Sequence, residues 1–201
     1  MPRTTEQFEQ MRKEREDHIL DAGLYLFATK GYESTSADAI SAIVKCSHGL
    51  LYHYYKSKEE LYQAVVEKRV RPIVHSLIAD VDFNQKAKFV FIDITERFLK
   101  ALKSVNDEYA WSIALMLDIH LQTVINPKIK HIEKDKKVYD WVFELIERGK
   151  QEGDFNDLSS RELVISMLAL YKGLSYNRIK IGHAKFLSPK TEIILNMVLK
   201  K

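Results

Sequence analysis

Apolar residues recur every three or four positions along most of the chain, and no stretch shows sustained alternation of apolar and polar residues. The first spacing places side chains on one face of an α-helix, whereas alternation is typical of a strand. We therefore predict an all-α protein. The pattern indicates helices over residues 4–29, two within 36–55, and then 58–70, 86–103, 107–124, 129–149, 159–182 and 189–201. The helix that starts at residue 58 either stops near residue 72 or continues with a kink to residue 77.

Residues 36–55 predict two short helices joined by a tight turn. Ser36 and Ser47 each precede a helical pattern, and a serine in that position caps the first amide groups of a helix. Two helices this close in sequence must cross at a steep angle, which is the helix-turn-helix arrangement. Lys45 lies in the turn, where the backbone must be left-handed, and a lysine there costs on the order of 1 kcal/mol.

The second helix of the pair has two distinct faces. Leu51 and Tyr55 are four residues apart and predict the buried face. The outward face is aromatic and polar and comprises His48, Gly49, Tyr52 and His53. No acidic residue occurs from position 46 to position 58. A helix of this length, roughly 12 Å, is as long as the DNA major groove is wide, so its outward face could meet base edges and phosphates.

The run from residue 19 to residue 65 resembles the DNA-binding domain of the TetR (tetracycline-repressor) family of transcriptional regulators. The matching segments are ILDAGLYLFATKGYESTS, the helix-turn-helix, and SHGLLYHYYKSKEELYQAV, about a quarter of the chain. The resemblance implies an N-terminal three-helix helix-turn-helix domain, residues 1–68, and a C-terminal helical ligand-binding and dimerisation bundle, residues 69–201. The family's usual Ala-Gly-Val turn reads Val44-Lys45-Cys46 here.

The family pattern also implies individual DNA contacts. Contacts with phosphate carry over to Thr35, Ser47, His53, Tyr54 and Lys58. Contacts with bases carry over to His48, Gly49 and Tyr52, with Leu50 as a candidate against a thymine methyl group. The alternative for His48 and His53 is that they are surface histidines without a role.

The C-terminal half carries an excess of apolar surface. Residues 160–181 are apolar nearly all round, so this helix must be covered on more than one side. Together with the last helix it could form half of a four-helix bundle across a two-fold axis. The candidate interface residues are Leu163, Met167, Leu170, Tyr171, Leu174, Ile194, Met197 and Val198. The alternative is that they complete the core of a single chain, and the resemblance implies the homodimer.

Large side chains of the middle helices could line a cavity for a small molecule. The candidates are Phe98, Trp111, Met116, His120, Tyr139, Trp141 and Tyr171. Any one of them is more often an ordinary core residue. The resemblance implies a small-molecule effector, and we expect it to be hydrophobic.

Composition narrows the function further. The net charge is only +3, and residues 1–68 hold nine Lys and Arg against eleven Asp and Glu, so binding of DNA by charge alone is not expected. A single Cys fits a reducing cytoplasm, and no apolar run approaches the roughly 20 residues of a membrane span. We find no metal-binding, phosphate-loop or nucleophile motif. We therefore predict no cofactor and no metal, and we disfavour a helical-bundle enzyme.

These observations predict a DNA-binding transcriptional regulator. We expect a ligand-released repressor that binds a palindromic operator in double-stranded DNA as a homodimer. The alternative is a constitutive DNA-binding protein whose C-terminal domain recruits a protein partner.

Overall fold

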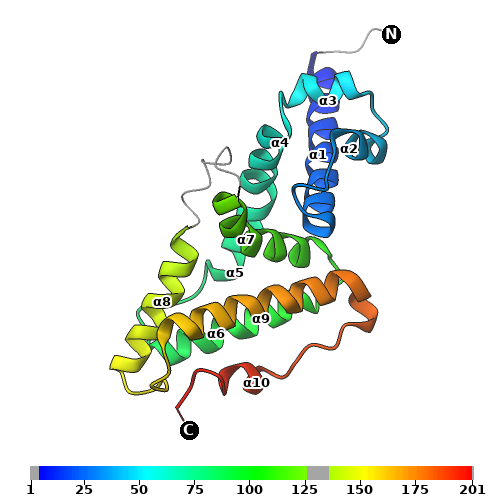
Figure 1. Ribbon diagram of the computed structural model, residues 1–201. Helices are drawn as coiled ribbons and strands as arrows, with labels where there is room; N and C mark the ends of the chain where they lie inside the picture. Colours follow the sequence, from blue (N-terminus) through cyan, green and yellow to red (C-terminus); the bar gives the residue numbers. More distant parts are fainter. Residues whose placement is uncertain (1–4, 126–135, 201) are drawn as a thin grey trace.

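The computed structural model describes residues 5–125 and 136–200, and these residues are helical apart from loops and one isolated bridge (Figure 1). The prediction of an all-α fold is confirmed. The elements are α1 (Thr5–Lys30), α2 (Ala37–Val44), α3 (His48–Tyr54), α4 (Lys58–Val65), the π-helix η1 (Val66–Val70), α5 (Arg71–Ile78), α6 (Ala87–Leu102), α7 (Glu108–Ile125), α8 (Lys136–Gln151), α9 (Ser160–Ile181), the 3-10 helix η3 (His183–Lys185) and α10 (Thr191–Leu195).

The N-terminal helices enclose a core of their own. Its buried side chains come from α1 to α4 and η1 and include Ile19, Leu20, Phe27, Ile40, Leu51, Leu61, Tyr62 and Val66. The predicted caps are present, since the hydroxyls of Ser36 and Ser47 accept hydrogen bonds from the amides of Ala39 and Leu50, both at 3.2 Å. Lys45 has φ 54° and ψ 49°, the left-handed conformation that the turn requires.

Helices α4, η1 and α5 form one continuous helical rod between the N-terminal and the C-terminal helices. The sequence left open whether the fourth helix stops near Pro72, and the structure shows that α4, η1 and α5 follow one another without a loop. Pro72 has no N–H to donate to the carbonyl of Lys68, as an α-helix would require. The Arg69 guanidinium donates to that carbonyl instead, at 3.4 Å. Such π-helical turns absorb a local break in α-helical hydrogen bonding without ending the helix.

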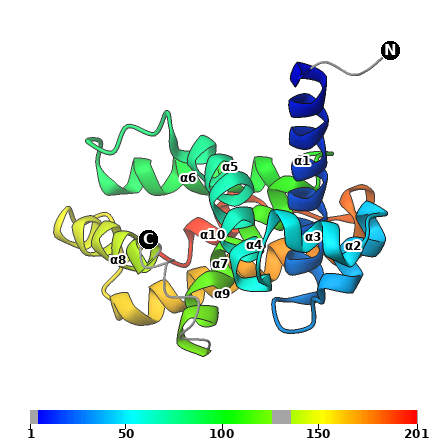
Figure 2. The ribbon, with the colours of Figure 1, turned by 90° about the horizontal axis from the view of Figure 1, so that it is seen from above.

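The C-terminal helices enclose a second core. It contains residues from α6 to α10, among them Phe91, Leu99, Leu102, Ile146, Phe155 and Val164. Helix α7 belongs to both cores, because Leu115 and Ile119 pack into the first and Ile113 into the second. Figures 1 and 2 show α7 between the N-terminal helices and α9. None of the helices in residues 5–125 and 136–200 is long and apolar enough to span a membrane.

The prediction of a helix over 189–201 is wrong for most of its length. Only Thr191–Leu195 is α-helical, and Leu199 pairs with Phe155 in an antiparallel bridge. The amide of Asn156 donates to Val198 O, and the amide of Lys200 donates to Asp154 O, both at 2.9 Å. The last residues therefore bond to a distant turn rather than along a helix. The break predicted at residues 126–127 lies outside the described residues.

Half of the predicted dimer interface is also wrong. Leu163, Met167, Ile194 and Val198 are at most 5% exposed, because they pack in the core of their own chain. A side chain with no exposed surface has no area to offer a partner. Leu170, Tyr171, Leu174 and Met197 are half-buried. The open alternative, completion of a single-chain core, holds for the first four residues.

Candidate nucleic-acid interface and apolar cavity

Helix α3 presents an open face at one end of the molecule (Figure 1). Leu51 and Tyr55 are buried in the core that α1 and α2 also form, whereas the side chains of Tyr52 and His53 between them point outside. His48, Tyr52 and His53 are exposed, and Tyr52 keeps 39% of its surface. A Cβ placed on Gly49 would meet nothing within 4 Å. Another backbone could therefore approach α3 closely at Gly49.

His48 and Tyr52 form one aromatic pair on this face. Their rings meet edge to face with centroids 4.8 Å apart. His48 Nε2 also lies 3.3 Å from Asp38 Oδ1, at the start of α2. The segment 46–58 contains no acidic residue, but the fold brings a carboxylate from α2 to this surface. Asp38 orients the imidazole and adds a carboxylate beside it.

The residues predicted to contact phosphate fall into two groups. His53 is exposed and Ser47 is exposed while capping α3, so both could reach a ligand. The Tyr54 hydroxyl instead donates to Arg12 O at 3.3 Å. Leu50, which was predicted to face a thymine methyl group and not a phosphate, is half-buried. Lys58 is half-buried, and its ammonium donates to Tyr32 O at 3.1 Å and lies 4.3 Å from the centre of the Tyr32 ring. Lys58 thus stabilises the end of α1 in this structure.

The prediction that Thr35 contacts phosphate is wrong for its side chain in this structure. Thr35 is 1% exposed, and its hydroxyl donates to Gly31 O at 2.8 Å. The Thr35 amide also donates to Tyr32 O at 3.3 Å. Thr35 therefore closes the turn between α1 and α2, a local role that its position in a turn-rich segment allows.

A cluster of ion pairs fastens the rod to α1. The Arg69 guanidinium donates to Asp17 Oδ1 at 2.7 Å and to Asp21 Oδ1 at 2.6 Å, and 20% of the Arg69 side chain is exposed. Lys68 pairs with Glu16, and this hydrogen bond lowers the pKa of the Glu16 carboxyl. We call Arg69, Asp17 and Asp21 the clamp. Sequence reasoning missed it, although two acids four residues apart on α1 signal one charged stripe.

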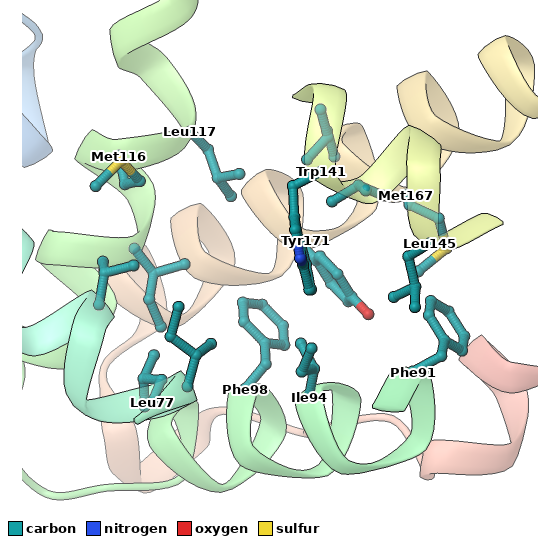
Figure 3. A pocket seen from close by; sticks show the side chains of 15 residues that line it. Leu77, Phe91, Ile94, Phe98, Met116, Leu117, Trp141, Leu145, Met167 and Tyr171 are labelled. Atoms are coloured by element: carbon teal, nitrogen blue, oxygen red, sulfur yellow. The ribbon is translucent and has the colours of Figure 1, made fainter. Parts of the chain in front are cut away.

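An apolar cavity of about 180 Å³ lies between the C-terminal helices (Figure 3). Its walls come from α5 to α9, and the lining is Val74, Leu77, Ile78, Phe91, Ile94, Phe98, Ile113, Met116, Leu117, Trp141, Val142, Leu145, Met167, Leu168 and Tyr171. The Tyr171 hydroxyl lies 2.9 Å from Thr95 Oγ1. Burial raises the pKa of Tyr171 to about 12, so the phenol stays neutral. The cavity suits an apolar ligand with few polar groups.

Four of the seven predicted cavity residues line this space, namely Phe98, Met116, Trp141 and Tyr171. Two predictions are wrong. Trp111 instead packs edge-on against Tyr25 of α1, with ring centroids 5.3 Å apart, and Tyr139 stacks on Phe143. The side chain of His120 lies outside the described part of the chain. Sequence reasoning missed the α5 wall, which the apolar spacing of Val74, Leu77 and Ile78 could have revealed.

Comparison with known proteins relates this chain to bacterial transcriptional regulators. The sequence model described as bacterial regulatory proteins of the tetR family matches residues 19–65, which span α1 to α4. The negative transcriptional regulator IcaR of the biofilm operon icaADBC of Staphylococcus epidermidis is 35% identical over 92 residues, 42% of this chain and 49% of that protein. Residues 19–65 of this chain are therefore similar to the TetR family of bacterial regulatory proteins. The chain spans about half the length of IcaR in that match.

A further relative is similar in sequence, and solved structures are similar in fold. The transcriptional regulator UidR of Escherichia coli is 24% identical over 143 residues, 69% of this chain and 67% of UidR. The ketosteroid regulator KstR2 of Mycobacterium tuberculosis superposes with a TM-score of 0.66 at 17% identity, over 93% of this chain and 96% of KstR2. A transcriptional regulator of Saccharomonospora viridis in complex with choline superposes with a TM-score of 0.64 at 20% identity, over 94% and 100%. All of these relatives and neighbours are described as transcriptional regulators.

Proposed function

We propose that this protein is a cytoplasmic repressor of the TetR family that a small apolar molecule releases from a palindromic operator. The observation that supports this most directly is that α5 forms one wall of the apolar cavity and continues through η1 into α4. Only three residues, 55–57, separate the end of α3 from the start of α4. A molecule in the cavity would therefore push on the same rod that carries the DNA-reading helix.

The outward face of α3 would enter the major groove. His48, Gly49 and Tyr52 would meet base edges, and Ser47, His53, Tyr54 and Lys58 would meet phosphates on either side. For Lys58 this requires the ammonium to exchange the carbonyl of Tyr32 for a phosphate. The DNA-binding part would be residues 1–68 and the regulatory part residues 69–201. The two cores divide slightly farther along the rod, because Val70 still packs in the first core and Leu77 packs against the second.

Two copies would read two half-sites. Such half-sites lie one helical turn apart, roughly 34–36 Å. Helix α9 offers a surface for pairing, since Ile165 is 60% exposed and Ala169 and Gly173 follow on the same side, both exposed. Small residues let two helix backbones approach closely, and the half-buried Leu170 and Leu174 would extend the contact. The dimer would fix the separation of the two α3 helices.

Release would follow from a change in that separation. The cavity side of the rod carries Val74, Leu77 and Ile78, and the clamp holds the adjacent η1 to α1. A ligand that displaces α5 would thus also displace α1 and the helices that pack against α1. The effect is limited to the ligand's difference in affinity between the two states, typically about 1–3 kcal/mol, or a 5- to 150-fold change in DNA affinity.

The test uses the purified chain and a fluorescent duplex selected from its own upstream region. Fluorescence anisotropy gives the Kd for DNA with and without small apolar molecules that raise the Tm of the protein. Leu117→Trp fills the cavity wall, and Leu187→Trp is its control because Leu187 is 87% exposed. We expect Leu117→Trp to bind DNA with a Kd that the ligand does not change, while the ligand should raise the Kd of Leu187→Trp as it does for the wild type. Normal release of Leu117→Trp by the ligand would contradict the proposal.

A further inference from the structure

A second hollow lies beside the apolar cavity and has the opposite character. This groove has a volume of about 530 Å³ and is lined by Ser76, Leu77, Arg97, Lys100, Ala101, Lys103, Ser104 and Tyr109. It is open to solvent along the C-terminal end of α6 and the start of α7. Three of its lining residues are cations, three carry hydroxyl groups and none is acidic. We call it the basic groove.

The positive charge of the basic groove is largely uncompensated. Lys100 and Lys103 are exposed, and within residues 5–125 and 136–200 neither ammonium has an ion-pair partner. Arg97 Nε donates to Asp93 Oδ1 at 2.7 Å, so part of the Arg97 charge is balanced. Asp107, in the loop that follows α6, pairs with Arg178 Nη2 at 2.7 Å. Two lysines therefore remain to attract an anion.

The helix dipole does not cancel this attraction. The C-terminal end of α6 carries partial negative charge, which would oppose an anion. The charge of Arg178 is balanced by Asp107, but its buried guanidinium hydrogen-bonds to carbonyl groups at that end, donating to Leu102 O and Ser104 O, both at 3.0 Å. Arg178 is 1% exposed and cannot itself reach a ligand in the groove. The carbonyl groups that would repel an anion are thus already occupied.

The basic groove and the apolar cavity share one lining residue, Leu77 of α5. On α6, Phe98 lines the cavity (Figure 3), while its neighbour in sequence, Arg97, lines the groove. We propose that the effector is an amphipathic anion, with its apolar body in the cavity and its anionic head on Lys100, Lys103 and Arg97. The proposal rests on the effector role of the cavity proposed above and names the chemical class of the ligand.

Size and position fit this class. An apolar cavity of about 150 Å³ accommodates benzene, so a cavity of about 180 Å³ takes one ring or a short alkyl chain. A carboxylate, sulfate or phosphate at the end of that body would emerge past Leu77 into the basic groove. The molecule would then hold Leu77 from two sides. Because Leu77 belongs to the rod, binding would act directly on the segment that leads to α4.

The experiment compares four probes that share an eight-carbon chain. Octanoate, octyl sulfate, octanol and octylammonium are titrated below their micelle concentrations, with binding measured by calorimetry and release of DNA by anisotropy. We expect each anion to bind about fivefold or more tightly than octanol, as one or two exposed ion pairs allow, and octylammonium to bind no more tightly than octanol. The advantage of the anions should shrink as salt is raised, whereas octanol binding should not change.

Matched variants locate the anionic head. Lys100→Gln with Lys103→Gln should remove the advantage of the anions and leave octanol binding unchanged. Lys185→Gln with Lys190→Gln removes two exposed lysines outside the groove and should change neither. A preference for octanoate over octyl sulfate, or the reverse, identifies the head group, and either anion supports the proposal.

Two negative results have different meanings. If octanol binds the cavity and releases DNA as well as the anions do, the amphipathic-anion proposal is wrong and the apolar-effector function stands. If no probe binds, or probes bind without affecting DNA, both proposals fail. An advantage of the anions that survives in the Lys100→Gln and Lys103→Gln variant would also overturn the assignment of the basic groove.

Discussion

Replacement of Arg69 by Gln should weaken the link between the cavity and the DNA-binding helices. Arg69 is the only arginine of the clamp, and its two carboxylate partners on α1 lie at 2.6 and 2.7 Å. The substitution leaves a shorter, neutral polar side chain and removes the charge and the forked hydrogen bonds. The α4–η1–α5 rod would then remain packed against α1 but would no longer be fastened to it.

The size of the effect follows from the exposure of the partners. The Asp17 and Asp21 side chains are 44% and 49% exposed, so solvent screens both pairs. Exposed pairs contribute about 0.2–1 kcal/mol each, which gives roughly 1 kcal/mol for the clamp. We expect the free energy of unfolding to fall by about that amount, and the Tm by roughly 2–4 °C. If the clamp also transmits the ligand signal, the ligand-induced loss of DNA affinity should shrink about fivefold.

Urea unfolding measures the loss of stability, and anisotropy titrations with and without ligand measure the coupling. Arg148→Gln is the control, because Arg148 donates to Phe83 O at 2.9 Å and pairs with Glu152 at 3.7 Å, both away from the clamp. The control should lose stability and keep normal release. If Arg69→Gln loses stability but releases DNA as strongly as the wild type, transmission through the clamp is refuted.

Three further predictions concern stability and are read by urea unfolding. Lys45→Gly removes the left-handed strain at φ 54° and should raise the free energy of unfolding by about 0.5–1 kcal/mol; a loss would show that the lysine side chain stabilises the turn. Gly149→Ala places a Cβ 2.5 Å from the Phe155 ring and should destabilise by about 1–3 kcal/mol, whereas an unchanged midpoint would mean that the ring moves freely. The pKa of Glu16 is lowered in the folded protein, so its bond to Lys68 stabilises the fold fully above the ordinary glutamate pKa, and this stabilisation is lost as the pH falls from there through the lowered pKa. Lys68→Met should therefore flatten the acid side of the stability curve, and an unchanged slope would contradict this assignment.

Local signals in the sequence were sufficient to predict α3 and the turn that precedes it. The caps of Ser36 and Ser47 and the inward positions of Leu51 and Tyr55 depend on residues within one or two turns. The same is true of the left-handed Lys45. These features could be predicted because their physical causes lie close together in the chain.

Features that depend on distant residues could not be predicted in the same way. Ile194 and Val198 looked like an unpartnered apolar face, but the chain folds back and buries them in its own core. Thr35 matched the family pattern, yet its hydroxyl donates a hydrogen bond to Gly31 O. Asp38 came close to His48 only once α2 and α3 crossed. Helical spacing gives the apolar face of an element but not which neighbour covers it.

On the function proposed above, the outward face of α3 reads the bases of duplex DNA. Selection from a randomised operator library, with wild type and His48→Ala compared side by side, tests it most directly. His75→Ala is the matched control, because His75 is exposed on α5 away from α3. We predict that His48→Ala relaxes the preference at one position of each half-site, by about 1–3 kcal/mol, while His75→Ala leaves every position unchanged. An identical site preference for His48→Ala and wild type would contradict the claim.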